Sequence, residues 1–205
     1  MREQLEKIWQ ESLPTHQEAF SGAYTFFQLL REINLQVNLL SRKLSPEDVF
    51  VDHILDCALG LPYFEKSQKI MDFGCGGGLP GMILAISYPD KEFVLLDKSP
   101  KKVHYLKIMK KKLGLENVKV QHEPTGIKEW DPDTITSRAV GNMSRVSHLI
   151  ETFLPLEGRT FYFYKARRES IEEECQNLPS SCKYNLHSLP YPEGLKERNL
   201  VELRY

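Results

Sequence analysis

The chain has 205 residues, of which 41% are hydrophobic and 27% are charged, and its formal net charge at pH 7 is -1. This length suffices for one domain with a substantial core, and the balanced charge excludes a polycation, so any nucleic-acid contact must come from a local basic patch. No apolar run approaches the ~20 residues that span a bilayer. The first seven residues also lack the apolar segment of a signal peptide, so we expect a cytoplasmic protein.

The cysteine and histidine pattern gives no sign of a metal or disulfide site. None of the four cysteines forms a Cys-x-x-Cys pair, and none lies at metal-ligand spacing from a histidine. We expect reduced cysteines that serve packing, and no bound metal.

Residues 1–62 are predicted to form an N-terminal helical extension that packs on the rest of the chain. Apolar residues from Phe26 to Leu40 recur at helical spacing. The sequence Ser45-Pro46-Glu47-Asp48 is typical of a helix start, because serine caps, proline fits the first turn and the helix dipole favours acids there. This helix is expected to end near Leu61, and no strand pattern of comparable strength precedes residue 68.

Strand and helix patterns alternate in the second unit, residues 63–205, which is predicted to be one compact domain. Predicted strands span 69–73, 92–97, 117–122, 134–139 and 159–165, and predicted helices span 80–88, 100–113, 143–154 and 167–178. Residues 184–189 and 200–204 are expected to close the sheet as an antiparallel pair. The pattern predicts an α/β fold with a doubly wound, mostly parallel seven-stranded sheet, which binds ligands at the carboxyl ends of its strands.

A glycine-rich turn follows the first predicted strand. The sequence Asp72-Phe-Gly-Cys-Gly-Gly-Gly-Leu-Pro-Gly81 leads into a helix opened by proline, and Asp97 ends the next strand. A ligand can lie against glycine backbone, and a carboxylate at the next strand end can hold a ribose diol, so the pair predicts a nucleotide-like cofactor. A tight turn without a ligand is less favoured, because glycines are costly in conformational entropy.

Two glycine spacings compete within this turn. Gly76-x-Gly78-x-x-Gly81 matches the dinucleotide fingerprint, which is weak as a bare pattern. Asp72-x-Gly74-x-Gly76-x-Gly78 instead resembles motif I of the class I S-adenosylmethionine (AdoMet) methyltransferases. A pyrophosphate favours free helix N–H groups with no anion nearby, whereas Asp72 suits the cationic amino group and sulfonium of AdoMet. We therefore expect AdoMet as the cofactor.

The helix predicted at 100–113 is strongly basic, since residues 98–112 contain seven lysines and no acidic residue. A solvated helix face is the usual interpretation of such a pattern. Beside a cofactor site, a patch for the phosphate backbone becomes about equally favoured. The residues predicted to bind such a backbone, which is RNA if the resemblance described next holds, are Lys101, Lys102, Lys107, Lys110, Lys111, Lys165 and Arg167.

With these motifs the chain resembles the RsmG (GidB) family of bacterial 16S rRNA guanine-N7 methyltransferases. The ending Gly78-Leu-Pro-Gly81 is more specific than the general AdoMet motif. Collinear companions are Glu32-Ile-Asn34-Leu, Asn38-Leu-Leu-Ser41, His53-Ile-Leu-Asp56, Leu95-Leu-Asp97-Lys-Ser-Pro-Lys-Lys102, Leu113-Gly-Leu-Glu-Asn-Val118, Ser137-Arg138-Ala-Val140 and Lys165-Ala166. The resemblance implies a Rossmann-like methyltransferase fold with an N-terminal helical extension, and 16S rRNA or the small ribosomal subunit as partner. We expect a monomer.

The resemblance also implies site residues. The family's cofactor positions fall on Gly74, Leu79, Asp97, Thr125-Gly126 and Arg138, to which the spacing argument adds Asp72, Gly76 and Gly78. Arg138 and Lys165 are the expected catalytic residues: Arg138 at the methionine part of AdoMet or the target base, and Lys165 at the RNA or the base.

One departure concerns the adenine edge. Where the family usually has Ala-Glu, this chain has Thr125-Gly126, so the expected carboxylate is absent. Glu123 and Glu129 are the candidates to replace it.

Methylation at guanine N7 requires no general base, because that nitrogen has an available lone pair. The lack of an evident catalytic dyad therefore favours N7 over oxygen methylation, with positioning as the enzyme's main contribution. Three alternatives stay open. The first is a non-catalytic RNA- or ribosome-binding paralogue with a weakened cofactor site, motivated by Gly126. The others are an NAD-type oxidoreductase and a small-molecule methyltransferase.

Overall fold

The computed structural model describes residues 1–123, 127, 130–138, 141–166, 168–190 and 197–205. Residues 1–68 contain helices and no strand. The elements are α1 (Arg2–Ser12), η1 (Gln17–Ala19), α2 (Phe20–Asn34), α3 (Pro46–Val49), η2 (Phe50–Leu55), α4 (Asp56–Ala58) and η3 (Leu61–Phe64). The helical character predicted for this part of the chain is confirmed.

The helix predicted to start at Ser45 does start there. Ser45 Oγ accepts a hydrogen bond from the Asp48 backbone N at 3.1 Å, and Asp48 Oδ2 accepts one from the Ser45 backbone N at 3.2 Å. This reciprocal capping box satisfies backbone donors that a helix start leaves free. The helix then widens into a π-helical segment, Phe50–Leu55, which the sequence pattern did not predict.

Seven strands form one sheet in the order β3-β2-β1-β4-β5-β7-β6. They are β1 (Lys69–Phe73), β2 (Glu92–Asp97), β3 (Val118–His122), β4 (Thr134–Arg138), β5 (Thr160–Lys165), β6 (Lys183–Ser188) and β7 (Asn199–Arg204). Neighbouring strands among β1 to β5 are parallel, and β7 is antiparallel to both β5 and β6. The predicted doubly wound, mostly parallel sheet is confirmed, including its antiparallel closing pair.

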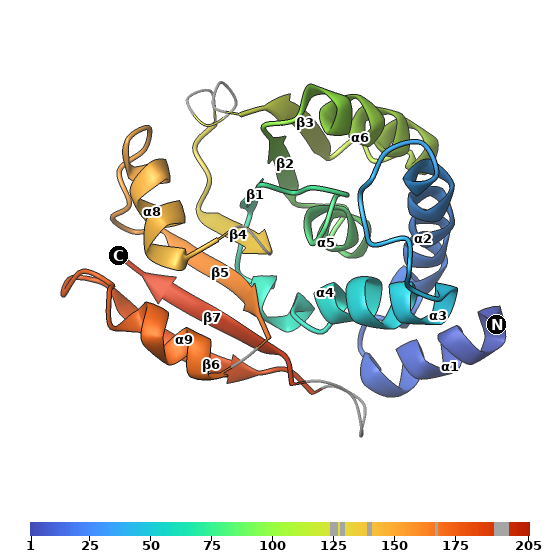
Figure 1. The fold of residues 1–205 in the computed structure, drawn as a ribbon, viewed down its shortest axis with the longest axis horizontal. Coiled ribbons are helices and arrows are strands. Elements are labelled where there is room, and N and C mark those ends of the chain that lie inside the picture. The colour runs from blue at the N-terminus through green and yellow to red at the C-terminus, as the bar shows by residue number, and fades with distance from the viewer. Residues whose placement is uncertain (124–126, 128–129, 139–140, 167, 191–196) are drawn as a thin grey trace.

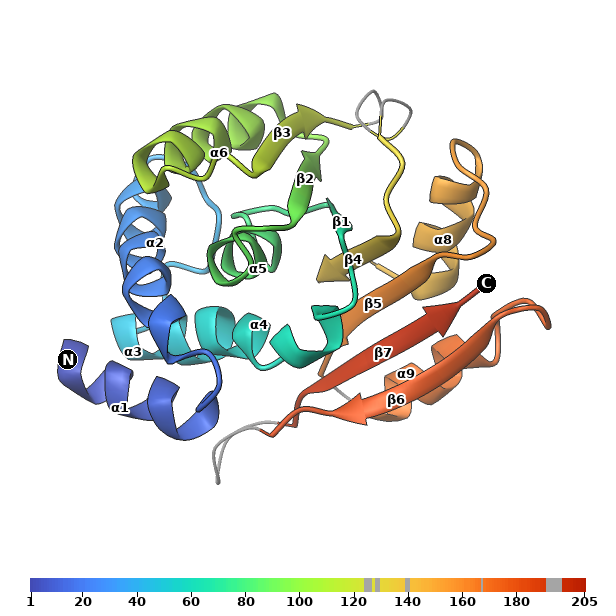
Figure 2. The same cartoon turned by 180° about the vertical axis from the view of Figure 1, so that it is seen from behind.

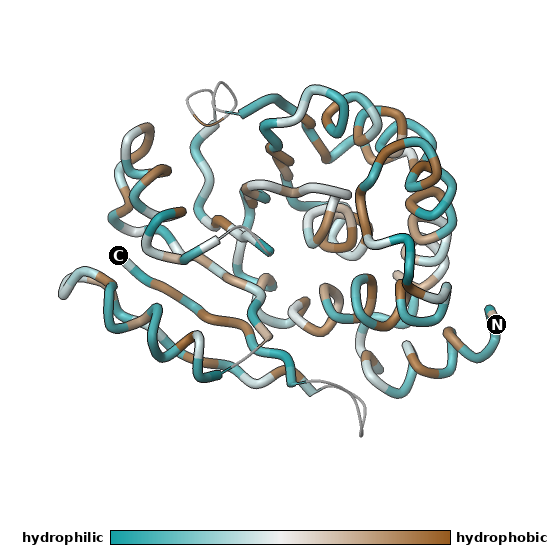
Figure 3. Tube along the Cα trace, in the orientation of Figure 1, coloured by the Kyte–Doolittle hydropathy of each residue, from teal (hydrophilic) through white to brown (hydrophobic). Residues whose placement is uncertain are grey.

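Helices cover both faces of this sheet, as Figures 1 and 2 show: α5 (Gly81–Ser87) and α6 (Pro100–Leu113) lie with the N-terminal helices on one face, and α8 (Met143–Glu151) and α9 (Arg168–Cys175) lie on the other. The sheet separates two apolar clusters, one on each face. Successive residues of β1 point into different clusters, since Ile70 belongs to the first and Met71 to the second. Figure 3 shows the hydrophobic stretch of β7 beside the mainly polar α9.

The N-terminal helices share the first of these clusters with the sheet. Trp9, Phe27 and Phe50 are fully buried in the cluster that also contains Ile70 and Leu95. Because this core is continuous, removing the helices would expose one face of the sheet. The division of the chain at residue 62 stays a prediction.

The glycine turn connects β1 to α5 at the point where the strand order reverses, because β2 and β4 lie on opposite sides of β1. Gly74, Gly76 and Gly78 have φ angles of 70°, 56° and 90°, which favour glycine over other residues. Gly78 also has no room for a side chain, because a Cβ there would lie 2.7 Å from Met82 Cγ. The peptide bond between Leu79 and Pro80 is cis, and α5 begins one residue later than predicted.

Replacing Gly78 with alanine is expected to lower the free energy of unfolding by about 2–4 kcal/mol, because left-handed strain adds to overpacking. Gly158→Ala is the matched control: Gly158 has φ of 77°, but no atom lies within 4 Å of its Cβ position. There we expect a loss of about 1–2 kcal/mol from strain alone. Denaturant unfolding measures both, and equal losses would contradict the close packing at Gly78.

Candidate functional site

A cavity of about 570 Å³ opens at the carboxyl ends of the parallel strands. Its walls come from the glycine turn, the ends of β2, β3 and β4, helix α8 and the segment after α2. The lining residues are Leu39, Leu40, Phe73, Gly74, Cys75, Gly76, Gly77, Leu79, Asp97, Lys98, Lys102, Glu123, Arg138, Gly141, Arg145, Val146 and Leu149. This size and mixed lining suit a nucleoside-sized ligand.

Asp97 fixes the glycine turn from the end of β2. Its Oδ2 accepts a hydrogen bond from the Gly76 backbone N at 2.9 Å, and its Oδ1 accepts one from the Ser99 backbone N at 2.8 Å. One carboxylate thus joins the turn to the start of α6. A carboxylate has about four acceptor positions, so Asp97 keeps capacity for a ligand in the cavity that it lines.

Asp72 lies beneath the turn and not on the cavity wall. Its side chain is fully buried, and its Oδ2 accepts a hydrogen bond from the Gly81 backbone N at 2.7 Å. Burial raises the pKa of Asp72 to about 7, although the Gly81 N–H and the charge of Arg138 oppose this shift. Asp72 therefore anchors the first turn of α5, while its Oδ1 has no hydrogen-bond partner among the described residues.

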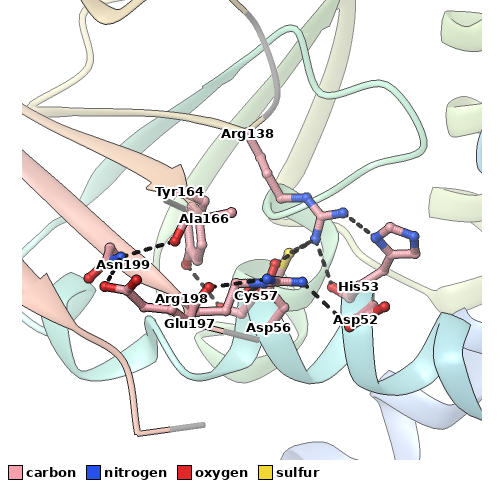
Figure 4. Close-up of polar contacts among 10 residues, drawn as sticks. All are labelled: Asp52, His53, Asp56, Cys57, Arg138, Tyr164, Ala166, Glu197, Arg198 and Asn199. Carbon is pink, nitrogen blue, oxygen red and sulfur yellow. Dashed lines mark hydrogen bonds and ion pairs between the residues drawn. The ribbon is translucent and has the colours of Figure 1, made fainter. Parts of the chain in front are cut away.

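Arg138 reaches the cavity from the end of β4, and residues of η2 and α4 hold its guanidinium group (Figure 4). Arg138 Nη1 lies 3.0 Å from Asp56 Oδ2 and 3.3 Å from the His53 carbonyl oxygen, and Nη2 contacts His53 Nδ1. Nη1 also donates to Cys57 Sγ at 3.4 Å. Burial raises the pKa of Cys57 to about 12, so this thiol stays protonated.

A second arginine completes this network from the other end of the chain. Arg198, just before β7, places Nε 3.0 Å from Asp56 Oδ1 and Nη2 3.4 Å from Asp52 Oδ1. Burial raises the pKa of Asp56, and the charges of Arg138 and Arg198 oppose that shift. Asp56 therefore joins an N-terminal helix to both β4 and the segment before β7, which the order of residues in the chain does not reveal.

The π-helical segment lies at this network. The backbone N–H of Asp56 donates to Val51, five residues back instead of four. Such turns re-aim a helix locally and occur frequently at functional sites. Here the segment carries both of the His53 contacts to Arg138.

The model of the family described as rRNA small subunit methyltransferase G matches residues 20–201. The chain belongs to this family. It is 39% identical over 181 residues to the ribosomal RNA small subunit methyltransferase G of Brachyspira hyodysenteriae, covering 86% of each chain. The protein of that name from Hydrogenovibrio crunogenus is 30% identical over 196 residues, covering 93% of this chain and 88% of the relative.

Solved structures support the same fold. An O-methyltransferase from Bacillus cereus in complex with SAH superposes with a TM-score of 0.64 at 14% identity and covers 100% of both chains. The METTL16 MTase domain superposes with a TM-score of 0.57 at 18% identity, covering 87% of this chain and 79% of that chain. The predicted Rossmann-like methyltransferase fold and the resemblance to the RsmG family are therefore confirmed.

Among the residues that the structure describes, no helix is long and apolar enough to cross a membrane. The same residues contain no group of three or more histidine, cysteine, aspartate or glutamate side chains that could hold a metal ion. The cysteines described there are free.

The structure does not place Lys165 on the cavity wall. Its Nζ binds both carboxylate oxygens of Glu174, at 2.7 and 2.8 Å, and donates to the Gly141 carbonyl at 3.0 Å. Glu174 also accepts a hydrogen bond from the Met143 backbone N at 2.8 Å. Lys165 thus ties α9 to the start of α8, and its predicted contact with RNA or the base stays a prediction.

The other predicted RNA-binding residues fall into two groups. Lys102 lines the cavity, and the exposed Lys101 lies four residues after Asp97, with Nζ 3.4 Å from the Gln36 carbonyl. A second, open cleft is lined by Lys107, Lys110, Lys111, Glu116, Lys119, Val120 and Gln121. Arg167, Thr125 and Gly126 lie outside the described residues, as does Glu129.

The sequence analysis missed one residue that shapes the cavity, and left another uncommitted. Asn34 ends α2, and its Oδ1 accepts hydrogen bonds from the backbone N atoms of Leu39 and Leu40, at 2.7 and 2.9 Å. It thereby fixes the apolar wall of the cavity; an asparagine near a helix end was the available signal. Glu123 lines the cavity from the end of β3, and its backbone N donates to the Asp97 carbonyl at 3.2 Å.

Asp72→Asn is expected to remove part of the pH dependence of stability. The folded-state pKa of Asp72 is raised to about 7, against about 4 for an unfolded aspartate. The folded state therefore holds a proton that the unfolded state releases. The stabilisation that results is fully present below pH ~4 and is lost as the pH rises toward and through ~7. The slope is at most about 1.4 kcal/mol per pH unit.

Denaturant unfolding at pH 4.5 and pH 7 measures this effect. The wild type should lose more stability between the two values than Asp72→Asn, which keeps an acceptor for the Gly81 N–H. Glu92→Gln, an exposed change of the same charge, is the control and should behave as the wild type. An unchanged pH dependence in Asp72→Asn would show that Asp72 is ionised in the folded protein throughout this range.

Proposed function

We propose that this chain transfers a methyl group from AdoMet to N7 of a guanine in 16S rRNA. The observation that carries the proposal is one cavity walled by the glycine turn, Asp97 and Arg138, in a chain of the rRNA small subunit methyltransferase G family. When bound, AdoMet supplies the reactive methyl group on its sulfonium. The chain's own residues have to hold that group and the base in line.

The residues of the cavity fit AdoMet. A Cβ at Gly76 would meet only the Gly74 carbonyl oxygen, at 3.9 Å, so the turn leaves open space above its backbone. Asp97 suits the ribose hydroxyls, and the Arg138 guanidinium suits the carboxylate of the methionine part. Above its pKa of about 7, Asp72 carries a negative charge beneath the turn, which disfavours a pyrophosphate there. This chemistry favours AdoMet over the NAD-type alternative.

Positioning and exclusion of water are the tasks left to the protein. The N7 lone pair attacks without prior deprotonation, so no side chain has to act as a base. Burial raises the pKa of Cys75 as well as that of Cys57, which keeps both thiols protonated and unreactive. Leu39, Leu40 and Leu149 supply an apolar wall against which a base can lie.

The basic groups offer a path for the phosphate backbone. Lys98, Lys102 and Arg145 lie at the cavity, and four lysines line the second cleft along with a single acid, Glu116. Helix α6 connects the two places, since it rises about 12 Å from Lys102 to Lys110. A strand of rRNA that enters the cavity can therefore also contact the cleft.

Transfer of a labelled methyl group to small ribosomal subunits and to free unmethylated 16S rRNA tests the proposal. We expect N7-methylguanine in at least one of these substrates. Absence of transfer to both, with AdoMet bound to the protein, would contradict the proposal and favour a non-catalytic RNA-binding paralogue. Labelling of small molecules without any labelling of rRNA would favour a small-molecule methyltransferase.

Replacing Lys107, Lys110 and Lys111 together with alanine is expected to weaken rRNA binding and its dependence on salt. Each lost phosphate contact reduces the magnitude of the slope of log K against log salt by about 0.7–0.9. The slope of the triple variant should therefore be smaller in magnitude by about 2–3. The matched control replaces the exposed Lys66, Lys69 and Lys183, which do not line the cleft. Filter binding across a salt series measures both, and equal slopes in the two triple variants would contradict a role for the cleft.

A further inference from the structure

Glu123 stands at one end of the cavity, opposite Arg138. The strand order β3-β2-β1-β4 places the end of β3, with Glu123, three strand spacings from the end of β4, with Arg138. At about 4.8 Å per spacing, this separation is about 14 Å. Asp97, at the end of β2, lies between them. The cavity therefore offers a cation at one end, a carboxylate for a diol in the middle and a second carboxylate at the far end.

The two carboxylates differ in what already occupies them. Both oxygens of Asp97 accept backbone hydrogen bonds, from Gly76 and from Ser99. The Glu123 carboxylate makes no hydrogen bond or ion pair to a described residue, although its side chain lines the cavity. The preceding residue, His122, has its Nε2 atom 2.9 Å from the Lys98 carbonyl oxygen. Burial and the charge of Asp97 raise the pKa of Glu123, while the charges of Lys98 and His122 oppose this shift.

Such a carboxylate can accept a hydrogen bond from an amine. In AdoMet the acidic end, the ribose diol and the adenine follow one another, which matches the order Arg138, Asp97 and Glu123 along the strand ends. The adenine carries one exocyclic amine, at position 6. The sequence has glycine at position 126, where the resemblance leads one to expect a carboxylate, and Glu123 lies three positions earlier.

We infer that Glu123 accepts a hydrogen bond from the 6-amino group of the adenine and selects an adenine nucleoside over its 6-oxo counterpart. The inference rests on the proposed use of AdoMet and adds a specificity residue to it. A charge-assisted hydrogen bond of this kind corresponds to about 10–100-fold in affinity. A site built around an amine also rejects the analogue that lacks it, because the carboxylate then loses its donor.

Calorimetric titration with S-adenosylhomocysteine and with its deaminated analogue, S-inosylhomocysteine, tests this selection without any turnover. The wild type should bind the adenosyl compound about 10–100-fold more tightly than the inosyl compound. In Glu123→Ala and Glu123→Gln the ratio of the two affinities should fall to near one. The control Glu92→Gln, at the opposite end of β2, should keep the wild-type ratio.

The outcomes separate the two proposals. A wild-type ratio preserved in both Glu123 variants, with tight binding of S-adenosylhomocysteine, would overturn the role of Glu123 and leave AdoMet as cofactor. Binding of neither compound by the wild type would overturn the AdoMet assignment and the role of Glu123 with it. A drop in affinity for both compounds by the same factor in the variants would also overturn the inference, because it would show a general effect on the cavity and no recognition of the amine.

Discussion

The carboxylate of Asp97 holds the functional end of the sheet together. Its oxygens bind the backbone of the glycine turn after β1 and the backbone before α6, at 2.9 and 2.8 Å. Its carbonyl also accepts a hydrogen bond from Glu123, which follows β3. The segments that leave three neighbouring strands thus meet at one residue. Since these segments wall the cavity, its shape depends on Asp97 before any ligand is bound.

The other side of the cavity depends on a buried cluster of charges. Arg138 enters the cavity from β4. His53 of η2 and Asp56 of α4 hold its guanidinium, and Arg198 binds the other carboxylate oxygen of Asp56. Removing one member of such a cluster leaves a buried charge without a partner, which typically lowers the free energy of unfolding by about 3–5 kcal/mol. The N-terminal helices therefore do more than cover apolar surface, because they also set the direction of the arginine at the site.

Much of this arrangement was predictable from local sequence. The predicted bounds of β1, β2 and α6 match the structure. Apolar runs and the glycine turn define the two strands, and Ser99-Pro100 and Gly114 mark the start and the end of α6. The family was also identifiable from Gly78-Leu-Pro-Gly81 and its collinear companions. These signals lie within a few residues of the elements that they specify.

What escaped prediction depends on contacts between distant parts of the chain. The charge of Asp72 was evident from the sequence, but its direction was not, and it points to Gly81 beneath the turn. Lys165 was expected at the substrate, yet its partner Glu174 lies on α9 and becomes apparent only once α9 packs against the sheet. The π-helical segment at Phe50–Leu55 gives no distinct periodicity, because the apolar residues around it also fit an ordinary helix.

Mapping N7-methylguanine along 16S rRNA tests the proposed function most directly. The rRNA would come from cells of the source organism with the gene, without it, and with the gene restored. The proposal predicts one guanine that is methylated at N7 with the gene, unmethylated without it and methylated again on restoration. Identical N7-methylguanine maps in all three strains would contradict it.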